Sequence, residues 1–159
     1  MHAIEHCAKT EAVDEQASVS KYRGGCHCGR VAYEVEGRLE RVEMCNCSIC
    51  TKKAYVHWIV PRGQFRLLTP WETLAIYTFN TGTAKHYFCP QCGVASFYIA
   101  RSDPDKIDIN VHCLEGVDVA AISADTFDGR NWEAARAARK HTQPAKMPPR
   151  LGKGLNQGR

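Results

Sequence analysis

The chain has 159 residues, of which 44% are hydrophobic, 24% are charged and 9 are cysteine. This length fits a single domain, and this composition excludes a wholly disordered chain. Apolar runs such as 94–99 are too short to span a bilayer, so we expect no membrane segment. Because the acidic N-terminus also lacks the apolar core of a signal peptide, we expect a cytoplasmic protein whose cysteines bind metal or act in redox chemistry.

The net charge of +4 is distributed unevenly along the chain. Residues 136–159 hold 7 of the 21 Lys and Arg residues and none of the 17 Asp and Glu residues. The body of the chain is therefore mildly acidic, and its C-terminal tail is basic. A basic tail can attract nucleic acid or an acidic surface, but a solvated extension is the simpler interpretation. We therefore do not expect the tail to bind nucleic acid or microtubules.

The predicted elements are mostly short strands. Residues 1–20 lack a sustained apolar period, so we expect a mobile arm there, in which Cys7 has no role. The sequence RVAYEVE at 30–36 places Val, Tyr and Val at every second position, which predicts a half-buried strand. Further strands are expected where β-branched and aromatic residues cluster between Gly and Pro: 56–60, 73–79, 86–89, 94–99 and 107–111.

This pattern predicts an all-β domain of antiparallel strands, with helix only near the C-terminus. Residues 132–141, WEAARAARKH, are rich in Ala and end on basic residues, as a short helix would. Several Pro and Gly residues follow, so we expect 142–159 to be a basic disordered tail. The chain is therefore divided into the arm at 1–20, a central domain at 21–141 and the tail.

Four of the clustered cysteines predict a closed metal site. Two cysteines in one turn can direct both sulfur atoms at one ion, while backbone N–H groups stabilise the thiolates. Such pairs occur in GGCHCG and in CPQCG. Since zinc prefers four tetrahedral ligands, we assign a structural zinc to both pairs together: Cys26, Cys28, Cys89 and Cys92. This site would join two hairpins and couple metal binding to folding.

The sequence CNCSIC holds a second cluster, made by Cys45, Cys47 and Cys50. Three protein ligands leave a fourth position for water or a substrate atom, which is typical of a catalytic zinc. We therefore expect two zinc ions, one structural and one catalytic. The alternatives for the second cluster are free thiols or a closed site with a histidine as fourth ligand, for which His57 and His86 are candidates.

Four motifs occur in a specific order, namely GGCHCG, CNCSICTK, FNTGTAKHYFCPQCG and FDGRNWE. In this respect the sequence resembles the glutathione-dependent formaldehyde-activating family, which includes centromere protein V. The resemblance covers residues 22–133. It implies an all-β "tent" of stacked antiparallel sheets, a structural zinc and a catalytic zinc. The structural ligands would be Cys26, Cys28, Cys89 and Cys92, and the catalytic ones Cys45, Cys47 and Cys50.

The resemblance also implies a carbon–sulfur lyase, S-(hydroxymethyl)glutathione synthase, which adds the thiol of glutathione reversibly to formaldehyde. Zinc lowers the pKa of a bound thiol, and the thiolate is the nucleophilic form. Our hypothesis is that the sulfur of glutathione takes the fourth position of the catalytic zinc. Because three thiolates donate charge to the metal, we expect it to activate sulfur rather than to polarise the carbonyl group of the aldehyde.

Two other functions compete with this enzyme. The first is a binding module of the centromere protein V type, in which zinc stabilises the fold and the tail contacts an acidic polymer. The second is a zinc-stabilised protein without chemistry.

The remaining residues of interest have simpler interpretations. Three basic residues could bind the carboxylates of glutathione, but a position on the solvated surface is the simpler interpretation for each of them: Lys52, Lys53 and Arg130. His86 lies next to the CPQC motif and is expected to be packed there rather than to carry protons. Phe127 and Trp132 are expected in the core, on either side of a turn at 128–129.

Overall fold

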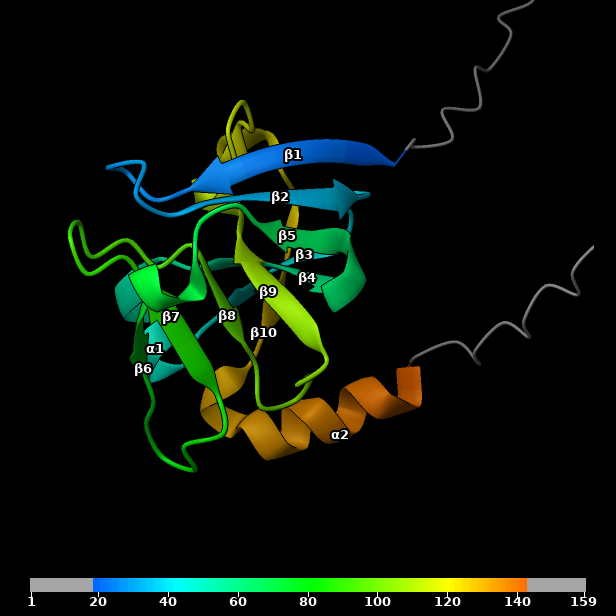
Figure 1. The fold of residues 1–159 in the computed structure, drawn as a ribbon. Helices are drawn as coiled ribbons and strands as arrows, with labels where there is room; N and C mark the ends of the chain where they lie inside the picture. Colours follow the sequence, from blue (N-terminus) through cyan, green and yellow to red (C-terminus); the bar gives the residue numbers. More distant parts are fainter. Residues whose placement is uncertain (1–18, 143–159) are drawn as a thin grey trace, which may run out of the picture.

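The computed structural model describes residues 19–142. Most of the predicted arm, including Cys7, and all but the first residue of the predicted tail lie outside this range. Within it, the strands form two sheets (Figure 1). The small sheet has the order β1-β2-β5 and contains β1 (Ser20–Gly25), β2 (Ala32–Gly37) and β5 (Phe65–Leu67).

The large sheet has the order β10-β3-β4-β9-β8-β7-β6. Its strands are β3 (Val42–Cys45), β4 (Val56–Pro61), β6 (Ala75–Tyr77), β7 (Lys85–Phe88), β8 (Phe97–Ile99), β9 (Lys106–Asn110) and β10 (Ala124–Phe127). The helices are α1 (Ser48–Lys53) and α2 (Trp132–Thr142). Single 3₁₀ turns lie at η1 (Arg62–Gln64), η2 (Trp71–Thr73), η3 (Val111–Cys113), η4 (Val119–Ala121) and η5 (Gly129–Asn131).

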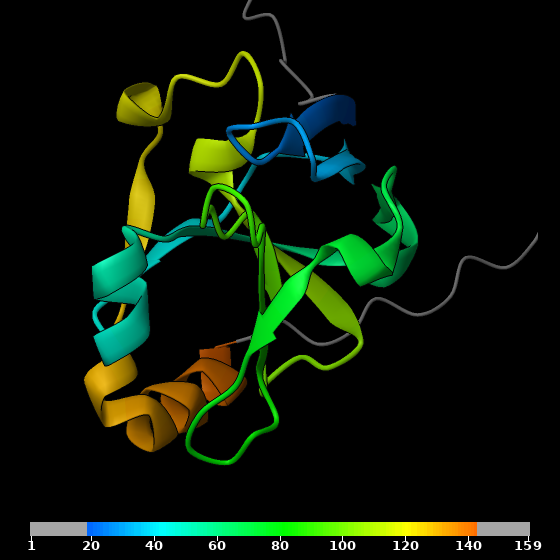
Figure 2. The ribbon, with the colours of Figure 1, turned by 60° about the vertical axis from the view of Figure 1, so that its left-hand side comes forward.

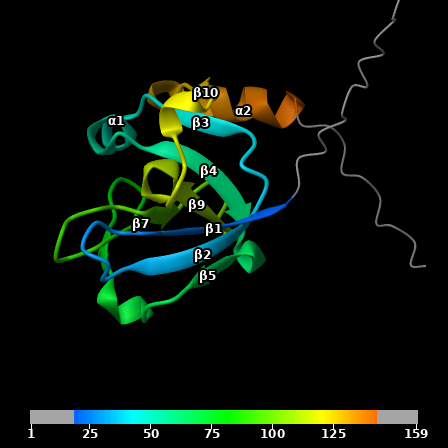
Figure 3. The same cartoon turned by 90° about the horizontal axis from the view of Figure 1, so that it is seen from above.

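The large sheet lies between the small sheet and the helices. Figures 1 and 3 place the small sheet and α2 on opposite sides of the large sheet. Figure 2 shows α1 and α2 together on the side away from the small sheet. The large sheet therefore has one face toward the small sheet and another toward the helices.

The hydrophobic core fills the space between the two sheets. Aromatic rings meet there from both sides, with the centroid of Phe97 on β8 lying 5.8 Å from that of Tyr33 on β2 and 4.9 Å from that of Phe65 on β5. Ile107 and Ile109 on β9 are fully buried. Since successive side chains of a strand point to opposite faces, alternate residues of β8 and β9 supply this core.

The predicted fold class is confirmed in its main features, because two sheets and a short C-terminal helix account for most of the described chain. Each predicted strand overlaps an observed one, although only 75–77 of the predicted strand at 73–79 is extended. The prediction of antiparallel pairing is wrong at β10, which runs parallel to β3, with Ala124 opposite Val42 and Phe127 opposite Cys45. Parallel pairing requires a long crossover, and the strands between β3 and β10 provide one.

Several elements were not predicted: β1, β5, β10 and α1. Ser20, the last residue of the predicted arm, is the first residue of β1. Among residues 19–142, no helix is long and apolar enough to cross a membrane.

Replacing Phe97 by Ala should destabilise the fold by about 3–5 kcal/mol, because it removes a ring at the centre of an aromatic cluster and leaves a cavity. Urea unfolding in zinc-containing buffer would measure this. The matched control is Ile76→Ala on β6, where the side chain is 54% exposed and the expected change is within about 0.5 kcal/mol. Equal stabilities of the two variants would contradict this description of the core.

Candidate metal centres and the adjoining pocket

The structure brings together the four cysteines assigned to a closed metal site. Cys26 and Cys28 lie in the turn between β1 and β2, and Cys89 and Cys92 lie between β7 and β8. The four sulfur atoms lie within 4.8 Å of one another, with Cys28 Sγ 3.6 Å from the sulfur atoms of both Cys26 and Cys89. Tetrahedral zinc with bonds of ~2.3 Å would separate its sulfur ligands by about 3.8 Å. This donor set therefore fits zinc.

The backbone around this cluster is arranged for negatively charged sulfur. The N–H of Val31 donates to Cys26 Sγ at 3.2 Å. A hydrogen bond from the backbone of Val94 lowers the pKa of Cys92 to about 6. A hydrogen bond from the Arg30 backbone lowers the pKa of Cys28, but partial desolvation and the neighbouring thiols together outweigh it and raise this pKa to about 11. Four thiolates this close together repel one another, and a divalent cation would offset that repulsion.

The second cluster is built where β3 meets α1. Cys45 is the last residue of β3, Cys47 is the N-cap of α1, and Cys50 lies in the first turn of this helix. Their sulfur atoms lie within 4.8 Å of one another. A hydrogen bond from the Cys50 thiol is the main reason that the pKa of Cys45 is lowered to about 5, and the same contact raises the pKa of Cys50. These three donors also fit zinc.

A segment from the far end of the domain covers this second cluster. The side-chain amide of Asn46 donates to Asp128 at 2.9 Å, and the Asn46 carbonyl oxygens accept hydrogen bonds from the Arg130 backbone N–H at 3.0 Å and from Arg130 Nε at 3.2 Å. A Cβ atom on Gly129 would overlap Cys45 Sγ and would lie 2.8 Å from Cys47 Cβ. Glycine is therefore required at 129 by close packing against the sulfur atoms. Sequence reasoning identified the turn at 128–129 but not this contact.

Neither histidine considered as a fourth ligand belongs to the second cluster. The ring nitrogens of His57 and His86 do not lie within 4.8 Å of all three sulfur atoms. His86 is packed face to face on Tyr98, with centroids 4.8 Å apart, and burial lowers its pKa to about 4. Burial also lowers the pKa of His57, but the Asp108 carboxylate outweighs this effect, so the pKa of His57 is raised.

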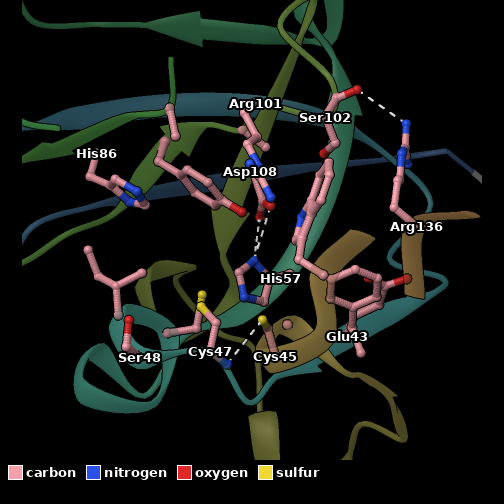
Figure 4. A pocket seen from close by; sticks show the side chains of 18 of the residues that line it. Glu43, Cys45, Cys47, Ser48, His57, His86, Arg101, Ser102, Asp108 and Arg136 are labelled. Atoms are coloured by element: carbon pink, nitrogen blue, oxygen red, sulfur yellow. Dashed lines mark hydrogen bonds and ion pairs between the residues drawn. The ribbon is translucent and has the colours of Figure 1, made fainter. Parts of the chain in front are cut away.

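A pocket of about 440 Å³ opens over the second cluster (Figure 4). Its sheet wall comes from the face of the large sheet that is turned away from the core, because residues at alternate strand positions line it: His57, Ile59, His86, Tyr98 and Asp108. The helix α2 contributes the opposite wall, which includes Trp132 and Arg136. His86 is packed, as predicted, but its neighbour is Tyr98, and strand alternation turns its side chain to the pocket side of the sheet.

The pocket has a basic rim whose arginines are held by neighbouring groups. The guanidinium group of Arg101 lies 3.6 Å from the ring centroid of Trp132. That of Arg139 lies 4.5 Å from the ring of Phe127 and 2.6 Å from a carboxylate oxygen of Glu43. The prediction that Phe127 and Trp132 belong to the core is therefore wrong, because both are half-buried pocket walls beneath arginines.

The three basic residues that were considered for binding carboxylates differ in position. Arg130 lines the pocket over the second cluster. Lys52 and Lys53 line a neighbouring hollow instead, together with Tyr77 and Phe79. Arg101, Arg136 and Arg139 also line the main pocket, and sequence reasoning missed them because their contacts join distant parts of the chain.

Replacing Cys89 by Ser should remove one zinc ion and the cooperative thermal unfolding transition. A structural zinc site contributes on the order of 10 kcal/mol, which is comparable to the ~5–15 kcal/mol stability of a whole domain. Zinc analysis by mass spectrometry and thermal unfolding followed by circular dichroism would test this. The control is Cys113→Ala, since Cys113 belongs to neither cluster. A Cys89→Ser variant with the wild-type midpoint would contradict the structural role.

Replacing Gly129 by Ala should leave the fold and the first zinc ion intact but weaken zinc binding at the second cluster, because the added methyl group would occupy space next to Cys45 Sγ. The matched control is Gly63→Ala, where a Cβ would meet nothing within 4 Å. Zinc stoichiometry after dialysis against a weak chelator is the measurement. Two tightly bound ions in Gly129→Ala would show that the segment does not cover the site in this way.

Comparisons with known proteins identify the family of this chain. A sequence model of the family described as glutathione-dependent formaldehyde-activating enzyme matches residues 21–129, which include both cysteine clusters. A solved structure of a Rhodobacter sphaeroides protein is 34% identical, and the match covers 65% of this chain and 97% of that chain with a TM-score of 0.61. The family match spans well over half of the sequence, and the chain therefore belongs to the glutathione-dependent formaldehyde-activating family.

Proposed function

We propose that this protein catalyses the reversible addition of the glutathione thiol to formaldehyde, giving S-(hydroxymethyl)glutathione, and is thus a zinc-dependent carbon–sulfur lyase. The observation that carries this proposal is the three-cysteine cluster at the wall of a pocket of about 440 Å³, where no histidine nitrogen of the described residues lies within 4.8 Å of all three sulfur atoms. Such a volume lies within the range of ~300–1,000 Å³ found for small-molecule sites.

The two clusters would have different roles. Cys26, Cys28, Cys89 and Cys92 would hold a structural zinc, since four thiolates complete its coordination. The three other cysteines, Cys45, Cys47 and Cys50, would hold a catalytic zinc. When bound there, this zinc would favour the thiolate form of a further thiol, which is the nucleophilic form.

The pocket walls suit a substrate with both charged and apolar parts. Glutathione has two carboxylates, and the guanidinium group of Arg130 is exposed at the rim and oriented by the Asn46 carbonyl. The other rim arginines already face carboxylates, so we assign the first carboxylate contact to Arg130. Aromatic walls, including Tyr98 and Trp132, would exclude water from the reacting atoms.

We also propose a cytoplasmic location and a functional domain that includes α2. A cytoplasmic location would keep the thiols of both clusters reduced. The functional domain would extend over 21–141, because α2 supplies one wall of the pocket although it lies beyond the segment matched by the family model.

Replacing Cys47 by Ser should reduce formaldehyde–glutathione exchange to the uncatalysed rate and remove one zinc ion, because the second cluster would keep only two thiolates. The exchange rate can be measured by NMR exchange spectroscopy with ¹³C-formaldehyde, after subtraction of the reaction without protein. Cys113→Ser is the control and should keep both the rate and the zinc content. If Cys47→Ser lost one zinc ion but kept the full rate, the proposed function would be wrong.

A further inference from the structure

A buried histidine–aspartate pair faces the second cluster across the pocket. His57 on β4 and Asp108 on β9 lie on neighbouring strands, and their side chains are only 5% and 2% exposed. The Nδ1 atom of His57 lies 3.1 Å and 3.0 Å from the two carboxylate oxygens of Asp108. Since a carboxylate accepts hydrogen bonds, Nδ1 carries the ring hydrogen, and the lone pair of the neutral ring is on Nε2.

The second ring nitrogen has no partner among the described residues. His57 Nε2 is fully buried and makes no hydrogen bond. A buried polar atom without a partner costs free energy, and such atoms are found where a bound group supplies the partner. Figure 4 shows the imidazole between Asp108 and the sulfur atoms of Cys45 and Cys47, so that one nitrogen faces the carboxylate and the other lies on the side of the sulfur atoms.

The position of the ring is fixed by aromatic neighbours. The ring of Tyr55 lies 4.7 Å from that of His57 at an angle of 36°, and the ring of Tyr98 lies 5.8 Å away at 71°. The hydroxyl group of Tyr55 donates to the backbone oxygen of Asp108 at 3.1 Å, which ties the two strands together at this point. The imidazole is therefore held in one orientation before any substrate binds, as a group that reacts at a fixed position requires.

We propose that His57 Nε2 moves the proton in the reaction, and that Asp108 positions the ring; this role rests on the proposed function. The Nε2 lone pair accepts the proton of the glutathione S–H, and the resulting sulfur lone pair forms the C–S bond. The π electrons of the formaldehyde carbonyl move to its oxygen, which takes the proton back from Nε2. The reverse reaction follows the same path. No electron is gained or lost, and the ring returns to its starting state.

The first experiment separates catalysis from folding and metal binding. His57→Gln should keep both zinc ions and a KM for glutathione within about twofold of the wild-type value, while kcat falls by about 100-fold or more, as expected for the loss of a general acid–base. His112→Gln is the matched control, since His112 is exposed and lies outside the pocket. If the wild type is active and His57→Gln is equally active, the role of His57 is wrong and the proposed function is unaffected. A wild type that does not accelerate the exchange would overturn the proposed function and this role with it.

The second experiment does not depend on activity. In ¹⁵N-labelled protein loaded with ¹¹³Cd in place of zinc, at a pH above the raised pKa of His57, the ring should show a proton on Nδ1, none on Nε2, and no coupling between ¹¹³Cd and either nitrogen. Coupling to Nε2 would make His57 a metal ligand and overturn the proposal. Asp108→Asn should move the proton to Nε2, because an amide group can donate to Nδ1, and should lower kcat more than it raises KM. Unchanged NMR signals in Asp108→Asn would show that Asp108 does not position the ring.

Discussion

The packing of the small sheet on the large sheet is the constraint on which the rest of the structure depends. The small sheet has only three strands, and one of them has three residues. A sheet of this size has little stability alone and needs a partner to cover its apolar face. Aromatic packing around Phe97 supplies that partner, and a metal ion held by the four clustered cysteines would fix the β1–β2 turn against the β7–β8 connection. Packing sets the distance between the sheets, and a metal ion bound to the four sulfur atoms would fix their alignment.

The two faces of the large sheet have different roles, one in the core and one in the pocket. Along β8, Phe97 and Ile99 are in the core while Tyr98 lies in the pocket, and along β9 Asp108 lies between two buried isoleucines. Because the side-chain period of a strand is two, a shift by one residue would exchange these faces and place a carboxylate in the core. The same register that buries the apolar residues therefore brings His57 and Asp108 together, although they lie on different strands.

The features of this molecule that could be predicted are those that produce a recognisable pattern within a short stretch of sequence. Cysteine spacing and the four-ligand preference of zinc were sufficient to divide seven cysteines into the two clusters that the structure brings together. The pairing of β10 with β3, the packing of Gly129 on Cys45 and the His57–Asp108 pair all join distant residues, and local patterns contain no information on such contacts. A charged residue between isoleucines, as at Asp108, was the one available signal. Aromatic composition alone could not distinguish a core residue from a pocket wall, which is why Trp132 was misplaced.

The position of Gly129 along the chain also sets the order in which the two metal centres can be completed. All ligands of the four-cysteine cluster have been synthesised once residue 92 has been added, before β8 and β9 of the large sheet exist. The second cluster has its three ligands by residue 50, but its cover is added only with residues 128–131. A growing chain therefore has these three thiols without their cover until residues 128–131 have been added. A metal ion would therefore reach these three cysteines without obstruction early in synthesis, and only through the pocket once the segment 128–131 has packed on them.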